Sequence, residues 1–211
     1  MGRNTTFDHE IINKALLRIV CSLMSLSETR PLAEQIMRTI DLKPHSDQWP
    51  KLYKIEAGKI EKLLRKNYVG SYHIGSTAIK GMISKFTIDI LIEVRSIEDI
   101  DFVLMDFEEL GYISEGEYGI KGRRFFHKGG DKRTHHIHIF ETGNPEIQRH
   151  RDFVEFLGCQ PVWAAKYRRL KIELADKYKS LPNEYSKGKR EFIQKMDREA
   201  KKWKAANNGN K

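Results

Sequence analysis

Residues 73–91 have the sequence His73-Ile-Gly-Ser-Thr-Ala-Ile-Lys-Gly-Met-Ile-Ser-Lys-Phe-Thr-Ile-Asp-Ile-Leu91. A Gly-Ser pair follows a short apolar strand, and Asp89 lies inside a β-branched, apolar run that predicts the strongest strand of the chain, residues 86–94. A glycine lets the backbone approach a phosphate, and a serine hydroxyl with neighbouring amides can hydrogen-bond its oxygens. A carboxylate on a neighbouring strand can hold a divalent cation on the same phosphate. We therefore expect Gly75, Ser76 and Asp89 to surround one phosphate site.

The stretches around this segment predict an α+β fold. Ser96 is placed to cap a helix that runs to about Leu110, and Gly111 is placed to end it. A Gly-Gly turn separates two runs of residues that are predicted to form antiparallel strands. Beside the strand at 86–94, the predicted strands are 72–74, 112–114, 123–128 and 135–140.

Helical periodicity dominates both ends of the chain and divides it into four parts. Apolar residues recur at helical spacing over residues 8–39, and again in the helix that follows the turn formers Pro44 to Pro50. Residues 145–204 are predicted to be helical, with a break at 180–185. The predicted parts are an N-terminal helical extension (1–40), an α/β core (41–144), a C-terminal helical region (145–204) and a flexible tail (205–211).

Two histidines and two basic residues alternate along the predicted hairpin. His136 and His138 point to one face, either as a metal-binding pair or as part of a polar sheet face. Arg124 and Lys128 also share a face, where they would either clamp a triphosphate or form a basic sheet edge.

Composition bounds the class of protein. The 211 residues are 39% hydrophobic, enough for a packed core, and carry a net charge of +9 with a pI near 9.4. A basic surface favours nucleotides, nucleic acid or other anions, although the basic C-terminal helix is also explained as a solvated face. No apolar run reaches the length of a membrane span, and no signal region opens the sequence, so we expect a cytoplasmic protein without a membrane partner. Two cysteines are expected to be buried and reduced.

The Gly-Ser to Asp arrangement resembles the nucleotidyltransferase superfamily, whose members carry Gly-Ser or Gly-Gly before acidic residues in a strand. More closely, Ile74-Gly-Ser-Thr-Ala-Ile-x-Gly-Met82 with Ile88-Asp-Ile-Leu91 is similar to the GrpB family. The similarity extends over residues 41–195. It includes Asp41-Leu-x-Pro44, Trp49-Pro50, Arg124-Phe-Phe-x-Lys128, His136-x-His138, Tyr167-x-x-Leu-Lys171 and Gly188-Lys189-x-x-Phe192.

This resemblance implies a nucleotidyltransferase-like mixed sheet with helices. It also implies transfer of a nucleotidyl group from a nucleoside triphosphate to an unknown acceptor, with a divalent metal (Mg or Mn, with Zn as a further option). Asp89 and Ser76 would be catalytic and Asp89 would hold the metal, with His136 and His138 as the further metal ligands that their common face suggests. The implied phosphate-binding residues are Gly75, Ser76, Thr77, Lys85, Arg124, Lys128, Lys171 and Lys189.

One position departs from the superfamily pattern. The second carboxylate of the usual metal clamp is replaced by Leu91. Glu93 shares the face of Asp89 but lies roughly 13 Å along the strand, too far to share one ion with it. Two alternatives therefore stand beside the transferase: a catalytically degenerate module that binds a nucleotide or another anion, and a metal-dependent hydrolase that uses Asp89, His136 and His138.

Overall fold

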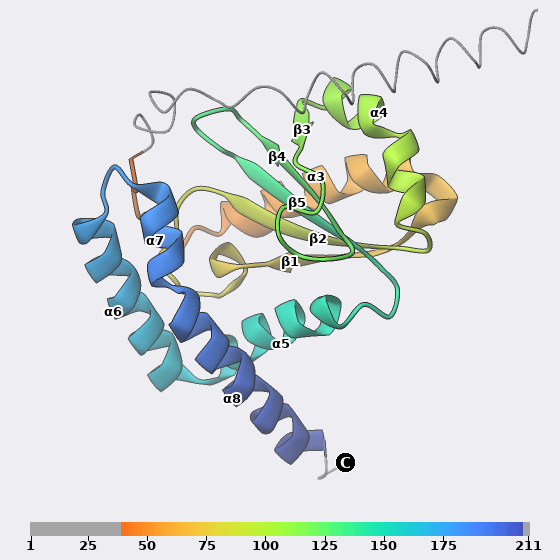
Figure 1. Cartoon of the computed structure of the whole chain (residues 1–211). Coiled ribbons are helices and arrows are strands. Elements are labelled where there is room, and N and C mark those ends of the chain that lie inside the picture. The colour runs from red at the N-terminus through yellow and green to blue at the C-terminus, as the bar shows by residue number, and fades with distance from the viewer. Residues whose placement is uncertain (1–38, 209–211) are drawn as a thin grey trace, which may run out of the picture. The chain divides into compact units, whose positions relative to one another are not determined.

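The computed structural model describes residues 39–208, whose fold is an α+β arrangement built on one five-stranded sheet. The predicted N-terminal extension falls almost entirely on residues 1–38, outside the described part (Figure 1). The strands are β1 Tyr68–Ile74, β2 Ile88–Val94, β3 Tyr112–Ser114, β4 Arg123–Lys128 and β5 His135–Glu141. The helices are α3 Gln48–Leu64, α4 Leu104–Glu109, α5 Pro145–Cys159, α6 Pro161–Lys177, α7 Pro182–Gly188 and α8 Arg190–Asn208.

The sheet is mixed, as the sequence predicted. Its strand order is β1-β2-β5-β4-β3. Strand β2 runs parallel to β5, and the other three neighbouring pairs are antiparallel. The predicted β4–β5 hairpin is present, with Gly129 and Gly130 both at positive φ in its turn. The central pair, β2 and β5, therefore brings Asp89 beside His136 in register.

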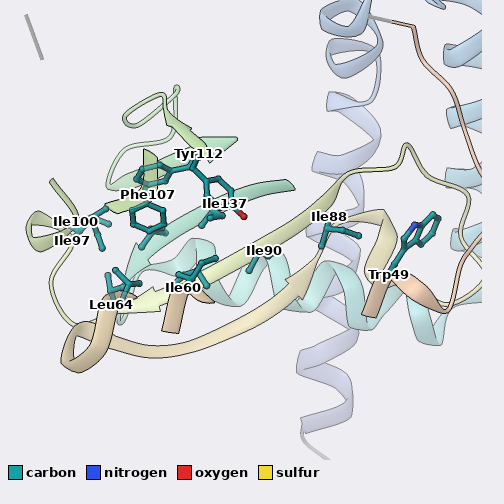
Figure 2. Packing of buried hydrophobic residues seen from close by; sticks show 14 residues of the cluster. Trp49, Ile60, Leu64, Ile88, Ile90, Ile97, Ile100, Phe107, Tyr112 and Ile137 are labelled. Carbon is teal, nitrogen blue, oxygen red and sulfur yellow. The ribbon is translucent and has the colours of Figure 1, made fainter. Parts of the chain in front are cut away.

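One face of the sheet, called here the α3 face, holds the main apolar core. It carries Ile88, Ile90, Ile137 and Ile139, all fully buried. Trp49, Ile60 and Leu64 of α3 pack against it, together with Phe107 and Tyr112 (Figure 2). Side chains alternate between the two faces along β2, so Asp89 points to the opposite face, which also carries the buried Leu91.

That opposite face, called the site face, carries Asp89, Leu91, His136 and His138. Helix α5 lies over part of it, where Ile147 packs with Leu91 and Phe140. Helices α5, α6 and α8 form a second apolar cluster around Phe153, Tyr167 and Met196 (Figure 1). The C-terminal helices thus lie on the same side of the sheet as Asp89.

Several boundaries differ from the predicted ones. Strand β1 begins at Tyr68 instead of Tyr72, and β5 ends at Glu141 instead of Phe140. Strand β2 begins at Ile88, since the half-exposed Phe86 precedes it. The helix predicted after Ser96 divides into a 3-10 turn, Glu98–Phe102, and the short α4, although Ser96 Oγ does accept from the Asp99 amide at 3.3 Å. Helix α8 continues to Asn208 instead of ending at 204.

Cys159 was predicted to be buried but is exposed, because it is the last residue of α5 and lies on the polar side of that helix. Cys21 lies outside the described residues. Among residues 39–208, none of the helices combines the length and the apolar character that crossing a membrane requires.

Candidate functional site

The Gly75 turn lies directly against the Asp89 carboxylate. Ile74, the last residue of β1, pairs with Asp89 in the sheet, and Gly75 follows with φ at +70°. A Cβ atom built on Gly75 would lie 2.4 Å from Asp89 Oδ2. The glycine is therefore required both by its left-handed backbone and by the carboxylate that occupies the side-chain space.

Two histidines of β5 contact Asp89 and keep it ionised. His136 Nδ1 lies 3.0 Å from Asp89 Oδ1, and His138 Nε2 lies 3.9 Å from the same oxygen. Burial by itself would raise the pKa of Asp89. The hydrogen bond with His136 and the nearby His138 outweigh it and hold the pKa well below its usual range. Asp89 is therefore a carboxylate at neutral pH, and its side chain remains 28% exposed.

The ring orientation of His138 is fixed by Arg123. An Arg123 Nη1 atom lies 3.3 Å from His138 Nδ1, and since a guanidinium only donates, Nδ1 must be the acceptor. Burial lowers the pKa of His138, so its neutral form carries the proton on Nε2, facing Asp89. Arg123 is in turn held by the carbonyl oxygens of Glu117 and Tyr118.

Two adjoining cavities meet at Asp89, which lines both together with Ser76 and Lys189. The first cavity, of about 250 Å³, has mixed apolar and polar walls. It is completed by Ile74, Gly75, His138, Arg149, His150, Phe153, Tyr167 and Ile193. The second, of about 220 Å³, is lined mainly by hydroxyl and ammonium groups. Its remaining residues are Ser84, Lys85, Thr87, His136, Lys171, Tyr185 and Ser186. We call the second one the lysine cavity.

Three lysines converge on the lysine cavity from different parts of the chain. Lys85 precedes β2, Lys171 comes from α6, and Lys189 lies between α7 and α8. The ammonium groups of Lys85 and Lys189 lie 5.2 and 4.4 Å from the centre of the Tyr185 ring. Lys171 is only 2% exposed, donates to the Ile83 carbonyl, and lies 5.3 Å from the Tyr167 ring centre.

The electrostatics of these lysines favour an anionic ligand. Burial, followed by the neighbouring Lys189, lowers the pKa of Lys171 to about 7. Burial, followed by Lys85, lowers the pKa of Lys189 to about 8. Asp89 is the carboxylate that raises the pKa of both lysines, but it does not offset their burial and their mutual repulsion. The positive charge of the two ammonium groups is therefore poorly compensated. A bound anion would restore the balance of charge.

The structure does not bring Arg124 and Lys128 to this site, contrary to the predicted triphosphate clamp. They share a face, as expected, but it is the α3 face. Side chains alternate along β4, and its residues on the site face are Arg123, Phe125 and His127. Arg124 instead forms a bidentate ion pair with Asp101, in which Nε and Nη2 donate to Oδ1 and Oδ2 at 2.7 and 2.6 Å. Lys128 Nζ lies 2.7 Å from Glu56 Oε1.

Thr77 is also not placed for the predicted phosphate-binding role. It is fully buried, and its Oγ1 lies 3.0 Å from His73 Nε2. Since His73 is half-buried and belongs to β1, this bond fastens the 3-10 turn Ser76–Ala78 to the strand before it. Thr77 therefore shapes the turn that presents Ser76.

Several residues in or beside the cavities were not among the site residues predicted from the sequence. Arg123 lines neither cavity but holds His138, and strand alternation indicates its position once the face of β4 is known. Tyr167, Tyr185 and His150 lie within residues 41–195, which resemble the GrpB family, and the sequence assigned them no role. Ser84 and Thr87 flank Lys85 in the loop before β2, where their contribution depends on the path of that loop.

A metal site with three protein ligands does not fit the described residues. In residues 39–208, no group of three or more His, Cys, Asp or Glu side chains is arranged to hold an ion. Asp89 Oδ1 is already engaged by His136 Nδ1, and position 91 is a fully buried leucine. A zinc site made of Asp89, His136 and His138 is therefore not supported. Magnesium differs, because one carboxylate together with substrate phosphates and water can satisfy it.

Several basic residues of the C-terminal helices form ion pairs within the chain. Lys187 pairs with Glu184 at 2.7 Å, Lys202 with Glu199 at 3.1 Å, and Lys204 with Glu155. These exposed pairs are typical of a solvated helix face. The lysine cavity is thus better suited than this surface to bind a defined anion.

The fold and the cavities define an α+β protein with a mixed sheet and a basic cleft beside a strand carboxylate. Its sequence matches the family model described as GrpB protein over residues 39–199. The chain belongs to the GrpB family.

Similarities to known proteins support this family assignment. A crystal structure of the conserved protein GrpB from Enterococcus faecalis is similar with a TM-score of 0.74 and 36% identity, covering 77% of this chain and 99% of that one. The UPF0157 protein YqkA of Bacillus subtilis is 39% identical over 171 residues, which are 81% of this chain and 50% of YqkA. The glutamate-rich protein GrpB of Alkalihalophilus pseudofirmus is 31% identical over 160 residues, covering 74% of this chain and 92% of that protein. The chain thus spans about half the length of YqkA.

Proposed function

We propose that this protein binds the phosphate groups of a nucleotide in the lysine cavity. The observation that carries the proposal is the convergence of Lys85, Lys171 and Lys189 with serine and threonine hydroxyls on one cavity beside an ionised Asp89. Lysine ammonium groups supply positive charge to phosphate oxygens, and hydroxyls donate hydrogen bonds to them. The adjoining cavity, with Phe153 and Tyr167 in its wall, offers an apolar surface to the rest of the ligand.

The geometry favours phosphate binding over any function that needs a complete acidic metal clamp. Leu91, at the position of the usual second carboxylate, is fully buried among Ile74, Phe140 and Ile147. An acidic side chain there would enter an apolar cluster at high cost. Asp89 therefore serves as a single carboxylate at the edge of a cationic cavity.

Replacing Lys189 tests the proposed cavity. We expect Lys189→Met to weaken ATP binding at least about tenfold, because a charge-assisted contact contributes roughly 1.5–3 kcal/mol. Methionine keeps much of the side-chain volume beside Tyr185, so the fold should persist. Isothermal titration with ATP, GTP, CTP and UTP, each with and without magnesium, measures the affinity.

The matched control is Lys201→Met, which removes an equal charge from an exposed position of α8. It should leave nucleotide affinity within about twofold, since distant surface charges are screened by salt. Equal affinities of Lys189→Met and the unchanged protein would show that phosphate does not bind at the lysine cavity.

Nucleotidyl transfer is the second candidate, and the contact between Asp89 and the Gly75 turn supports it. Asp89 would hold a magnesium ion whose other ligands are phosphate oxygens and water, and the ion would supply charge neutralisation when bound. Ser76 and its neighbours would orient the phosphates, while Lys189 would stabilise charge that develops on them.

Asp89→Asn separates transfer from binding alone. We expect the substitution to abolish any nucleotidyl transfer, at least about 100-fold, because an amide removes the negative charge that holds the cation. Labelled ATP, CTP, GTP and UTP with magnesium or manganese, incubated with pools of small-molecule, protein and RNA acceptors, provide the assay. If the unchanged protein transfers no label and releases no pyrophosphate, the chain is a binding module only.

A further inference from the structure

We propose that Lys171 is a nucleophilic amine that forms an imine with carbonyl compounds carrying a phosphate group. The proposal rests on the proposed phosphate binding in the lysine cavity and adds a covalent activity to it. Lys171 lies on the cavity wall together with Lys85, Lys189 and three serines. A phosphate held by these groups would place the rest of the same small molecule against the Lys171 side chain.

The position of Lys171 is unusual for a lysine that only binds an anion. Its side chain emerges from the middle of α6 and is 2% exposed. The amine donates to the Ile83 carbonyl and lies over the ring of Tyr167, so it is held at one place. A lysine that recognises phosphate as a point charge needs neither this burial nor an aromatic floor.

Burial and the nearby cations favour the neutral form of Lys171, whereas the Ile83 carbonyl and the Tyr167 ring favour its ammonium form. Burial contributes most, and Lys189, Lys85 and Arg168 add positive charge around it, while Asp89 opposes them. The pKa of Lys171 is lowered to about 7, so its unprotonated form is well populated near neutral pH. An ordinary lysine, with a pKa near 10.4, has less than about one part in a thousand unprotonated there. Desolvation and neighbouring cations are the two conditions that activate an amine as a nucleophile.

The covalent step balances without any added oxidant or reductant. The Lys171 nitrogen lone pair attacks the carbonyl carbon, forming a C–N bond, and one proton moves from nitrogen to the former carbonyl oxygen. The resulting carbinolamine loses that oxygen as water with the second nitrogen proton. A C=N bond remains between Lys171 and the phosphate-bearing molecule.

Pyridoxal 5′-phosphate is a suitable probe, because it carries both an aldehyde and a phosphate. The full chain is incubated with it near pH 7.5 and reduced with borohydride, and the modified lysine is located by peptide mass spectrometry. We expect Lys171 to be labelled at least about tenfold faster than exposed lysines such as Lys177. Pyridoxal without the phosphate should label Lys171 at least about tenfold more slowly, since it loses the anchoring group.

Two variants make the result specific. Lys171→Arg retains a positive charge but has no amine that can form an imine, so labelling at this position should disappear while the labelling of exposed lysines persists. Lys177→Arg, on the same helix, should leave Lys171 labelling unchanged. Labelling confined to exposed lysines, or equal labelling of Lys171 by pyridoxal and its phosphate, would overturn the proposal.

Nucleotide titration of the same preparation separates this proposal from the one on which it rests. If ATP binds and Lys171 remains unlabelled, the imine proposal alone is wrong. If neither ATP nor the probe is bound, both proposals fail at the phosphate site.

Discussion

Gly75→Ala is expected to destabilise the protein by about 2–4 kcal/mol. A residue with a Cβ atom loses about 1–3 kcal/mol at the φ of +70° and ψ of −167° of Gly75, a region that essentially only glycine adopts. The larger part comes from the clash of the new methyl group with Asp89 Oδ2 at 2.4 Å, which must push the carboxylate away from His136. Urea-induced unfolding followed by circular dichroism measures the change in the free energy of unfolding.

Gly58→Ala is the matched control for that substitution. Gly58 lies inside α3, and a Cβ atom there would have no other atom within 4 Å. Alanine should therefore be neutral or should stabilise the helix, by up to about 1 kcal/mol. A Gly75→Ala variant as stable as Gly58→Ala would contradict the tight contact between the turn and Asp89.

A second background isolates the part of the cost that is due to the carboxylate. In Asp89→Ala the Oδ2 atom is gone, whereas the left-handed backbone of residue 75 is unchanged. The penalty of Gly75→Ala should then fall by about 1 kcal/mol or more, which a double-mutant cycle reports as coupling. Additive effects of the two substitutions would mean that the backbone alone makes glycine necessary.

The central part of the site was predictable because it depends on neighbouring strands. Strand alternation placed His136 and His138 on one face, and the β-branched run around Asp89 predicted the strand that became β2. The Gly-Ser turn follows β1, which pairs antiparallel with β2, so the turn and Asp89 meet at one end of that pair. These relations need only local pattern and one short connection.

The orientation of β4 was not predictable in the same way. Alternation correctly put Arg124 and Lys128 on a common face, but the choice between the two faces depends on the register of β4 against β5. A shift of one residue exchanges the faces completely. Buried residues of β4 point to both faces of the sheet. The hydrophobic pattern of the strand therefore could not show which face Arg124 and Lys128 would occupy.

The lysine cavity depends on tertiary packing of distant segments. Lys171 and Lys189 match family positions, but nothing in their local sequence distinguishes them from the solvated lysines of the same helices. They reach Asp89 because α6, α7 and α8 pack together around Phe153, Tyr167 and Tyr185. Burial of a charged side chain is a property of the folded protein, and it is this burial that gives Lys171 its unusual chemistry.

Glu56→Gln is expected to destabilise the protein by about 2–3 kcal/mol at pH 7. Glu56 is buried under the α3 face, where it accepts from Lys128 and Lys59 at 2.7 Å each and from the Tyr112 hydroxyl at 3.1 Å. Glutamine keeps the shape but loses the charge that both lysines compensate, leaving a charge network incomplete. Glu61→Gln, at an exposed position of the same helix, should change stability by less than about 0.5 kcal/mol.

The same residue predicts an acid dependence of stability. Burial by itself would raise the pKa of Glu56, but the bonds from Lys128 and Lys59 outweigh it and lower the pKa to about 2 from an ordinary 4.5. Because the pKa is lowered in the folded state, the stabilisation is fully present above about pH 5. It is lost as pH falls toward 2, by about 2–3 kcal/mol. Glu56→Gln should lack this component, so its stability should approach that of the unchanged protein as pH falls over this range.

Lys128→Met decides between a structural and a ligand-binding role for this lysine. The ion pair with Glu56 predicts lower stability with unchanged ATP affinity, because Lys128 lies on the face of the sheet opposite the lysine cavity. Glu56→Gln combined with Lys128→Met should cost less than the sum of the single changes, as expected for partners in one network. Weaker ATP binding by a fully stable Lys128→Met protein would instead restore the triphosphate clamp and require β4 to present its other face.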